Sequence, residues 1–461
     1  MTAPDWAWWG EGPGPVPLAH AVRVIQQGAR FEEAVLAGDR TGPPLDRALQ
    51  AYQREHRAMG RNDRLLLGAA VFGLARNRDA IRRALPGAEP GRGSHLLLAL
   101  LDGLAVEPER VPGLPGGPEP WRRAAQALAD VRAEGVRVAQ RTRSTPLNAL
   151  SASARSNLAA LFSVPDWWFE NGPWDTVGQA TEELARLKRP QQLCLRAQAH
   201  RGNRESAVAA LSALGIPVRS TLRSPWGVLV EGRHNVLGTD VVRRGVVEVQ
   251  DEGSQLVACL CDPRPNERIL DLCAGGGGKT LALASMMGGR GLVIAHDAAT
   301  ARLADTRLRA RRAGLGNVRV VAGADEVERL GPYDLVLVDA PCSSSGTLRR
   351  NPDVAWRWPR DSVVQLTDTQ ARILDHAAGL VAPGKTLVYV TCSLLPAENG
   401  RQIEAFLGRH PEFDFFPLGD RRSHGPLLDV SGADRGAFRL PADLARYSGD
   451  AFFLARLRRR R

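Results

Sequence analysis

The first 145 residues carry apolar side chains at helical spacing and show no alternating pattern of the kind that predicts strands. Four stretches have this spacing: 19–25, 65–72, 95–105 and 119–139. Segments rich in proline and glycine interrupt them at 85–93 and 112–118 and predict loops. We therefore expect residues 1–145 to form an all-helical domain.

A mixed pattern follows over residues 146–244. Short apolar runs at Leu193–Arg196 and Gly227–Glu231 predict two strands. Between them, Glu205–Leu214 has helical spacing, and the Gly-Ile-Pro sequence at 215–217 predicts its end. We expect a small α+β domain in this part of the chain.

From residue 245 the pattern alternates between strands and helices. Apolar runs of strand length lie at 269–272, 292–295, 318–321, 335–338 and 387–390. Helical stretches separate most of them, at 279–287, 299–313, 361–382 and 396–409. This alternation predicts an α/β domain over 245–461, with a mainly parallel sheet and helices on both faces. Ligands of such sheets bind at the carboxyl ends of the strands, so we expect functional residues just after the strands.

Charge narrows the class of partner. The 461 residues contain 61 Lys and Arg against 50 Asp and Glu, a net charge of +11 that favours a polyanion such as nucleic acid. Residues 456–461 are rich in arginine and predict a solvated basic tail that assists RNA binding without specificity.

Several classes of protein do not fit. No apolar run approaches the about 18 residues that a membrane span needs, so we expect no membrane protein. Residues 1–6 lack a basic segment followed by an apolar stretch, so no secretory signal is indicated. Six cysteines without a Cys-x-x-Cys pair predict neither a disulfide framework nor a bound metal. We expect a reduced, cytoplasmic protein and favour a monomer.

One strand leads through four glycines into a helix. Residues 273–280 read Cys-Ala-Gly-Gly-Gly-Gly-Lys-Thr. Glycine permits sharp turns and close approach of a ligand, and a helix N-terminus offers free N–H groups to an anion. A dinucleotide, the phosphates of ATP and S-adenosylmethionine are each compatible with such a loop. A Walker A motif would need glycine at Cys273, and a dinucleotide fingerprint would need it at Thr280.

Two acidic residues follow the next two strands. Asp297 lies where a carboxylate can accept hydrogen bonds from both hydroxyls of a ribose, or can cap the helix that follows. Asp325 lies where it could meet an adenine amine or belong to a solvated turn. Both are therefore candidates for binding a nucleotide-like ligand.

The last two expected strands each deliver a cysteine to the same sheet edge. Asp339 and Cys342 follow one strand, and Cys392 follows the other. We expect the strands to be neighbours and the thiols to face one pocket, although a single cysteine in such a place is more often a buried apolar residue. Thiols are nucleophiles as thiolates, which Lys279 and nearby helix ends would favour. Asp339 also resembles a Walker B aspartate, so an NTPase remains an alternative.

Taken in order, these motifs resemble the Nop/Sun family of RNA cytosine-5 methyltransferases. The segments that carry the resemblance are Phe162–Trp168, Leu195–Arg196, Gln250–Leu256, Cys273–Thr280, Asp339–Asp353, Thr391–Ser393 and Gly449–Ala455. Asn62–Leu66 and Val71–Arg76 are more weakly similar to the NusB-like domain that precedes the bacterial small-subunit rRNA members. The resemblance implies that the regions 1–145 and 146–244 bind RNA.

The resemblance implies a Rossmann-like domain with a mainly parallel seven-stranded sheet that uses S-adenosylmethionine. The residues expected to bind this cofactor are Cys273, Ala274, Gly275, Gly276, Gly277, Gly278, Lys279, Asp297, Asp325 and Asp339. The implied partner is ribosomal RNA of the small subunit, free or in an assembly intermediate.

The resemblance also implies catalytic roles. Attack of a thiolate at C6 of cytosine makes C5 enamine-like and able to accept a methyl group. The family pattern assigns this attack to Cys392, and assigns removal of the C5 proton and release of the enzyme to Cys342. Asp339 would hydrogen-bond the N3/N4 edge, and Lys279 completes the expected catalytic set. The target base must leave its stack to reach such a pocket.

Two places depart from the family pattern. Gly275 and Gly276 stand where alanine and proline are usual, which loosens the loop. Gln198 stands where the lead-in segment usually has asparagine, two residues after Arg196. An inactive RNA-binding assembly factor is therefore a second alternative beside an NTPase. The two thiols argue against it, because binding alone needs neither.

Overall fold

The computed structural model describes residues 24–25, 28–38, 42–103, 106–111, 114–189, 191–232, 234–417, 437–440 and 449–461. The chain divides into two compact units. The first consists of Met1–Pro190 and Thr347–Arg360, and the second of Gln191–Gly346 and Asp361–Arg461. Most of the helix expected over 19–25 lies outside the described residues. Within them, no helix is both long and apolar enough to cross a membrane.

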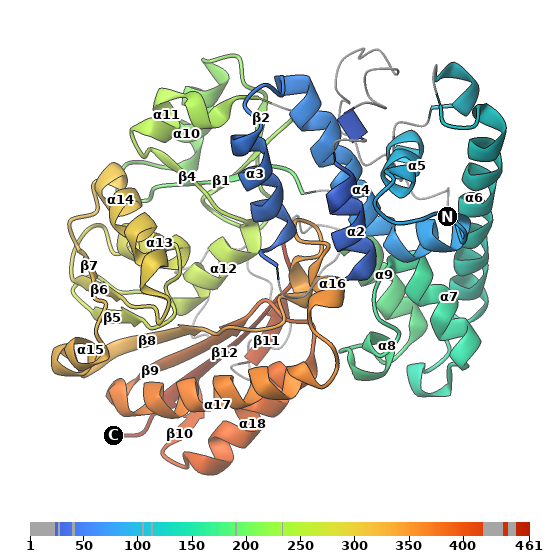
Figure 1. The fold of residues 1–461 in the computed structure, drawn as a ribbon. Helices are drawn as coiled ribbons and strands as arrows, with labels where there is room; N and C mark the ends of the chain where they lie inside the picture. The colour runs from blue at the N-terminus through green and yellow to red at the C-terminus, as the bar shows by residue number, and fades with distance from the viewer. Residues whose placement is uncertain are drawn as a thin grey trace. The chain divides into compact units, whose positions relative to one another are not determined.

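The first unit is built from helices (Figure 1). In chain order they are α2 Ala29–Ala37, α3 Leu45–Glu55, α4 Arg61–Ala84, α5 Ser94–Gly103, α6 Pro118–Arg141, α7 Ala152–Phe162, α8 Trp168–Asn171, α9 Val177–Lys188 and α16 Val354–Arg357. The helical stretches expected at 65–72, 95–105 and 119–139 correspond to α4, α5 and α6. The first strand of the described chain begins at Cys194, in agreement with the absence of a strand pattern before it.

The sequence explains why these helices pack together. Every residue of Leu96–Leu101 in α5 is buried, and α5 packs against α4, whose Leu67 and Val71 are also buried. At the start of α9, the Thr176 hydroxyl accepts the N–H of Gln179, whose side chain in turn accepts the N–H of Thr176. These two hydrogen bonds fix the start of α9, a helix that the spacing of apolar residues alone did not predict.

A separate piece of chain completes the helical unit. Thr347–Arg360 belongs to it, although its neighbours in sequence do not. Arg76 donates from Nη2 to the carbonyl oxygen of Arg349 at 2.9 Å, and the Asp353 carboxylate accepts the N–H of Leu45 at 3.2 Å. The first unit is therefore discontinuous in sequence.

The second unit begins with a small antiparallel sheet in the order β2-β3-β1-β4. Its elements are β1 Cys194–Ala197, α10 Arg204–Ser212, β2 Val218–Ser220, β3 Gly227–Val230, α11 Asp240–Arg243 and β4 Val247–Val249. Apolar residues such as Leu195, Leu211 and Val228 form its core. The two strands and one helix expected here are confirmed. The pattern missed β2 and β4, which have three residues each.

The large sheet follows the order β10-β12-β9-β8-β5-β6-β7, and β11 pairs with β12. Its strands are β5 Arg268–Asp271, β6 Leu292–Ala295, β7 Val318–Val320, β8 Tyr333–Asp339, β9 Val381–Thr391, β10 Phe413–Phe415, β11 Ala437–Leu440 and β12 Phe452–Arg459. The strands from β5 to β9 pair in parallel, whereas β12 is antiparallel to its neighbours. All five expected strands are present, and the expected Rossmann-like α/β fold is confirmed.

Helices cover both faces of this sheet (Figure 1). They are α12 Glu252–Cys261, α13 Gly278–Met286, α14 Leu303–Ala313, α15 Ala324–Leu330, α17 Ser362–Leu380 and α18 Gly400–Arg409. Leu281 of α13 packs with Leu337 on one face, and Leu374 of α17 packs with Val336 on the other. Strand order reverses between β5 and β8, so ligands are expected at the loops after these strands.

The expectation of a solvated basic tail at 456–461 is wrong. Residues up to Arg459 belong to β12, which lies between β9 and β10. Arg456 is 4% exposed, and Arg459 donates from Nη1 to the carbonyl oxygen of Val381 at 2.7 Å. Arg460 pairs with Asp414 at 2.7 Å. These arginines bind neighbouring strands of the sheet, and the aliphatic part of the Arg456 side chain tolerates a burial that a pattern of charges does not suggest.

Candidate active site

The glycine loop after β5 is anchored to both neighbouring strands. The N–H of Leu272 donates to the carbonyl oxygen of Leu337 in β8 at 2.9 Å. The N–H of Ala274 donates to the carbonyl oxygen of His296, just after β6, at 2.8 Å. The loop therefore opens at the place where the strand order reverses.

Glycine is required at two turns of this loop. Gly275 has a φ of 55° and Gly277 a φ of 79°, a region that side chains rarely adopt. A Cβ atom on Gly277 would also lie 2.6 Å from Cγ2 of Thr306 in α14. The absence of a side chain at Gly277 allows the loop to pass close to α14 before α13 begins.

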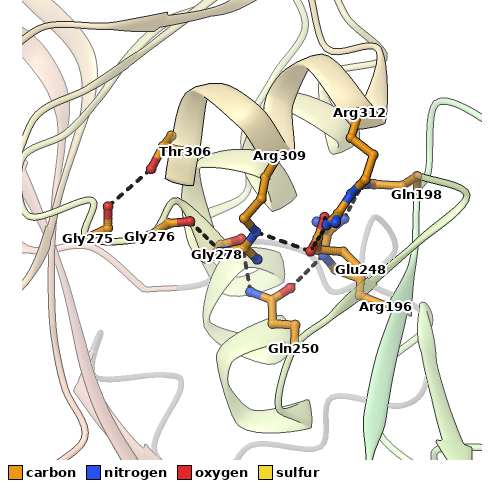
Figure 2. Close-up of polar contacts among 10 residues, drawn as sticks. All are labelled: Arg196, Gln198, Glu248, Gln250, Gly275, Gly276, Gly278, Thr306, Arg309 and Arg312. Atoms are coloured by element: carbon orange, nitrogen blue, oxygen red, sulfur yellow. Dashed lines mark hydrogen bonds and ion pairs between the residues drawn. The ribbon is translucent and has the colours of Figure 1, made fainter. Parts of the chain in front are cut away.

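Side chains hold three of the loop carbonyls (Figure 2). Thr306 donates from Oγ1 to the carbonyl oxygen of Gly275 at 3.1 Å, and Arg309 donates from Nη1 to that of Gly276. The amide of Gln250 donates to the carbonyl oxygen of Gly278 at 3.1 Å. These contacts restrain a loop whose glycines would otherwise leave it conformationally free.

Arg196 and Gln198 connect the small sheet to this network (Figure 2). Arg196 is 2% exposed and donates from Nε to Gln250 at 2.6 Å and from Nη1 to Gln198 at 2.8 Å. Burial lowers the pKa of Arg196 to about 10, which leaves it charged at neutral pH. Because Gln198 is also buried, neither side chain offers a surface contact to RNA in this structure. They support the glycine loop instead.

The structure treats the two candidate acids differently. Asp297 is 6% exposed, and its carboxylate accepts the N–H of Gly275 at 2.7 Å and that of Ala299 at 2.8 Å. It therefore lies against the glycine loop, where a ribose acceptor was expected, and it also stabilises the turn before α14, where a helix cap was expected. Asp325 is exposed in the first turn of α15, and in the described chain no hydrogen bond or ion pair joins it to another residue.

Lys279 and Asp339 form an ion pair across the carboxyl ends of the strands. Nζ of Lys279 lies 2.7 Å from Oδ2 of Asp339, and the lysine side chain is 8% exposed. Burial alone would lower the pKa of Lys279, but the charge of Asp339 and its hydrogen bond outweigh it and raise that pKa. A thiolate at Cys392 would raise it further. Lys279 is therefore a fixed positive charge beside Asp339 at the carboxyl ends of the strands.

Sequence reasoning missed Asp271, the last residue of β5. Thr280 donates from Oγ1 to its Oδ2 at 2.6 Å, whereas Oδ1 is buried and has no hydrogen-bond partner in the described structure. Burial raises the pKa of Asp271 to about 7. An acid at the end of a short apolar strand, just before a glycine loop, was the signal that could have identified it.

The two cysteines after β8 and β9 lie side by side. The Sγ atoms of Cys342 and Cys392 are 3.6 Å apart, within hydrogen-bonding distance for sulfur. The hydrogen bond to Cys392 and burial raise the pKa of Cys342 well above its ordinary value. Burial likewise raises the pKa of the loop cysteine, Cys273. Cys342 is therefore a protonated thiol beside the sulfur of Cys392.

Comparisons with known proteins point to one family. A family model described as 16S rRNA methyltransferase RsmB/F matches residues 258–458. A protein of Synechocystis named probable ribosomal RNA small subunit methyltransferase B is 33% identical over 311 residues, which cover 66% of this chain and 68% of that protein. Ribosomal RNA small subunit methyltransferase B of Shewanella oneidensis is 29% identical over 420 residues, covering 88% of this chain and 92% of that protein.

Solved structures show the same fold. A methyltransferase homolog from Pyrococcus horikoshii aligns with a TM-score of 0.56 and 25% identity, covering 67% of this chain and 100% of that protein. The structure of NSun6 from the same organism, determined with SFG, aligns with a TM-score of 0.53 and 17% identity, covering 61% of this chain and 94% of the other.

Proposed function

The chain belongs to the RsmB/F family of 16S rRNA methyltransferases, and from this we propose that it methylates carbon 5 of a cytosine through a covalent bond to Cys392. Membership of this family makes it an S-adenosylmethionine-dependent methyltransferase that acts on small-subunit rRNA. The observation that supports cytosine-5 methylation through a covalent bond is the pair of thiols 3.6 Å apart at the carboxyl ends of adjacent strands.

The residues after β5 and β6 fit S-adenosylmethionine. Gly275 and Gly277 permit the sharp bend of the loop, and Cys273, Gly276 and Gly278 remain partly exposed in it. Asp297 is fixed by the Gly275 N–H, and each of its oxygens retains a lone pair that can accept a ribose hydroxyl. The bound cofactor supplies the methyl group. We assign its binding to the loop Cys273–Lys279, to Asp297 and to Asp339.

Each thiol has a separate task in this mechanism. Sγ of Cys392 forms a bond to C6 of the cytosine, and the electron pair of the C5–C6 double bond becomes available at C5. After C5 has been methylated, Cys342 gives its own proton to solvent, takes up the C5 proton as a thiolate, and the bond between Sγ and C6 breaks to release the RNA. The raised pKa of Cys342 supports this division, because it keeps Cys342 from competing as a nucleophile and makes its thiolate a strong base toward the C5 proton.

Asp339 and Lys279 organise the pyrimidine edge. The Asp339 carboxylate can accept a hydrogen bond from the N4 amino group while it remains paired with Lys279 at 2.7 Å. Positive charge from Lys279 stabilises negative charge on a Cys392 thiolate nearby. The helical region 1–145 and the region 146–244 are assigned to RNA binding, with an affinity that decreases as salt rises.

Trapping of the covalent intermediate tests the proposal. Cys392→Ser should abolish methylation, because a serine alkoxide is far less accessible near pH 7 than a thiolate. Cys342→Ser should transfer the methyl group and remain bonded to its RNA, giving an adduct that survives denaturation when S-adenosylmethionine is present. The double variant should give none.

The alternatives make different predictions. An NTPase or an inactive RNA-binding assembly factor would give no adduct in any variant. An adduct in Cys392→Ser, with none in Cys342→Ser, would reverse the roles of the two cysteines. Mapping of 5-methylcytosine in small-subunit rRNA, with and without the protein, would identify the target base.

A further inference from the structure

The two cysteines share a feature that the mechanism has not used. Each is followed by a serine, and both serines donate hydrogen bonds to the carboxylate of Glu398. Ser343 donates from Oγ to Oε2 at 2.6 Å and from its N–H to Oε1 at 2.8 Å. Ser393 donates from Oγ to Oε2. One carboxylate therefore joins the two loops that carry the thiols.

Glu398 is deeply embedded in this arrangement. It is 0% exposed, and Gln370 of α17 donates from Nε2 to its Oε1 at 3.0 Å. The same amide nitrogen donates to the carbonyl oxygen of Pro341 at 3.0 Å, just before Cys342. Next to Glu398, Asn399 donates from Nδ2 to the carbonyl oxygen of Ser393 at 2.9 Å. Burial of a carboxylate is costly unless hydrogen bonds satisfy it, so this cluster needs an explanation.

We propose that Glu398 is a positioning residue that sets the separation of the Cys342 and Cys392 thiols. The strands alone do not do so, because β8 ends at Asp339 and the regular pairing with β9 ends where Asp339 faces Val390. Beyond that pair, the N–H of Ala340 donates to the carbonyl oxygen of Val390 and the N–H of Gly346 to that of Cys392, both at 2.9 Å. Cys342 lies between these two contacts, and Glu398 fixes the segment that carries it through the hydroxyls of Ser343 and Ser393.

The proposed reaction needs such a device, and to that extent this inference rests on the proposed function. Cys392 bonds to C6, and Cys342 must reach the proton on C5, so the two sulfurs act on the two ends of one bond. A displacement of about 1 Å in a reacting group can reduce a rate about 100-fold. We therefore expect Glu398→Ala to lower kcat by about 100-fold and to leave KM for the cofactor unchanged.

The conservative variant separates position from charge. In Glu398→Gln, the amide oxygen can accept from Ser343 and Gln370, and the amide nitrogen can donate to the serine oxygens after their hydroxyls rotate. The loops should therefore stay joined, and kcat should fall by less than about tenfold. Rescue by glutamine but not by alanine is the result expected of a positioning residue.

Arsenite provides a readout that needs neither RNA nor cofactor. As(OH)₃ condenses with two close thiols to form two As–S bonds, and two hydroxyl groups leave as water with the two thiol protons. We would measure the arsenic bound to the full chain by mass spectrometry, and Cys342→Ser would identify the share that depends on this pair. Wild type and Glu398→Gln should bind alike, whereas Glu398→Ala should bind at least about tenfold more weakly.

A matched control tests for general damage. Glu252 is another buried carboxylate, and it accepts the N–H of Arg223 at 3.0 Å and that of Ser224 at 3.1 Å in the loop between β2 and β3. Glu252→Ala should lower the Tm but leave arsenite binding at the wild-type level. If Glu398→Ala does not fold, Ser393→Ala removes one side of the connection and should weaken arsenite binding on its own.

The outcomes are distinguishable. Folded Glu398→Ala that binds arsenite and forms the RNA adduct as wild type does would overturn the inference, as would unchanged binding in a Ser343→Ala, Ser393→Ala double variant. If arsenite binding depends on Glu398 but Cys342→Ser traps no RNA, the positioning role stands and the proposed covalent mechanism fails.

Discussion

Cys342 and Cys392 lie on loops that follow neighbouring parallel strands, and their Sγ atoms are 3.6 Å apart. Their hydrogen bond makes the state of one thiol depend on the other. The contact with Cys392 is the largest cause of the raised pKa of Cys342, and burial is the next.

Removal of Cys392 should therefore lower the pKa of Cys342. In Cys392→Ser, the pH dependence of alkylation of Cys342 by iodoacetamide, followed by mass spectrometry, should shift toward lower pH than in wild type. A shift of about one pH unit would correspond to about 1.4 kcal/mol. The same alkylation profile in both proteins would mean that the sulfur–sulfur contact does not control Cys342.

Asp297→Ala should weaken binding of S-adenosylmethionine. The variant loses two charge-assisted acceptor sites and frees the Gly275 N–H, so we expect a cost of about 1.5–3 kcal/mol by calorimetry. Asp325→Ala is the matched comparison, because this exposed acid has no contact that holds it in place. An equal loss in both variants would identify Asp325 as an adenine contact, and unchanged affinity in Asp297→Ala would remove Asp297 from the site.

Lys279→Met should be more harmful than the double change Lys279→Met, Asp339→Asn. The single variant removes the buried lysine and leaves the partly buried Asp339 carboxylate unpaired, whereas the double variant removes both charges. Denaturant unfolding should give a coupling free energy of about 1–3 kcal/mol between the two positions. If the effects of the two single changes on the free energy of unfolding add up to that of the double change, solvent screens the Lys279–Asp339 pair.

Asp271→Asn should change the pH dependence of stability. The pKa of Asp271 is about 7 in the folded protein against an ordinary value of 3.8, so the folded chain binds an extra proton between these values. Its contribution to stability therefore falls as pH rises through this range. Asparagine does not titrate, and the stability of Asp271→Asn relative to wild type should rise by about 2–3 kcal/mol between pH 5 and pH 8. A difference that is constant with pH would contradict the assignment.

Deletion of residues 456–461 should destabilise the methyltransferase sheet, and the effect should not be confined to RNA affinity. The deletion removes half of β12, including the buried Arg456 and the contact of Arg459 with Val381. We expect a clear loss of Tm or of soluble protein. Arg460→Gln changes the charge without removing the strand and should leave the Tm within about 2 °C of wild type. A truncated protein with normal Tm but weaker binding to all RNAs would restore the idea of a basic tail.

The sequence predicted those strands and helices whose pattern of apolar residues matches their burial in the folded protein. The runs 335–338 and 387–390 are apolar because both faces of their strands are buried, so they were recognisable. β12 was recognised only in part, because the family resemblance identified Gly449–Ala455 as a closing strand, whereas Arg458 and Arg459 are held by carbonyls that only the folded sheet brings near. Glu398 carries no local signal either, since its serine partners lie 55 and 5 positions away. Arg196 was recognised as part of a motif, but its partner Gln250 and its burial come from tertiary structure.

The position of β12 also constrains the order in which the domain can assemble. β12 follows every other strand of the sheet in the chain, yet it pairs with β9 along six residues and separates it from β10. While the chain is being synthesised, the edge of β9 beside the Cys392 loop stays unpaired until residue 459 has left the ribosome. An unpaired strand edge is a site for association with other chains. Nascent chains are therefore vulnerable to aggregation in the interval between the synthesis of β9 and that of β12.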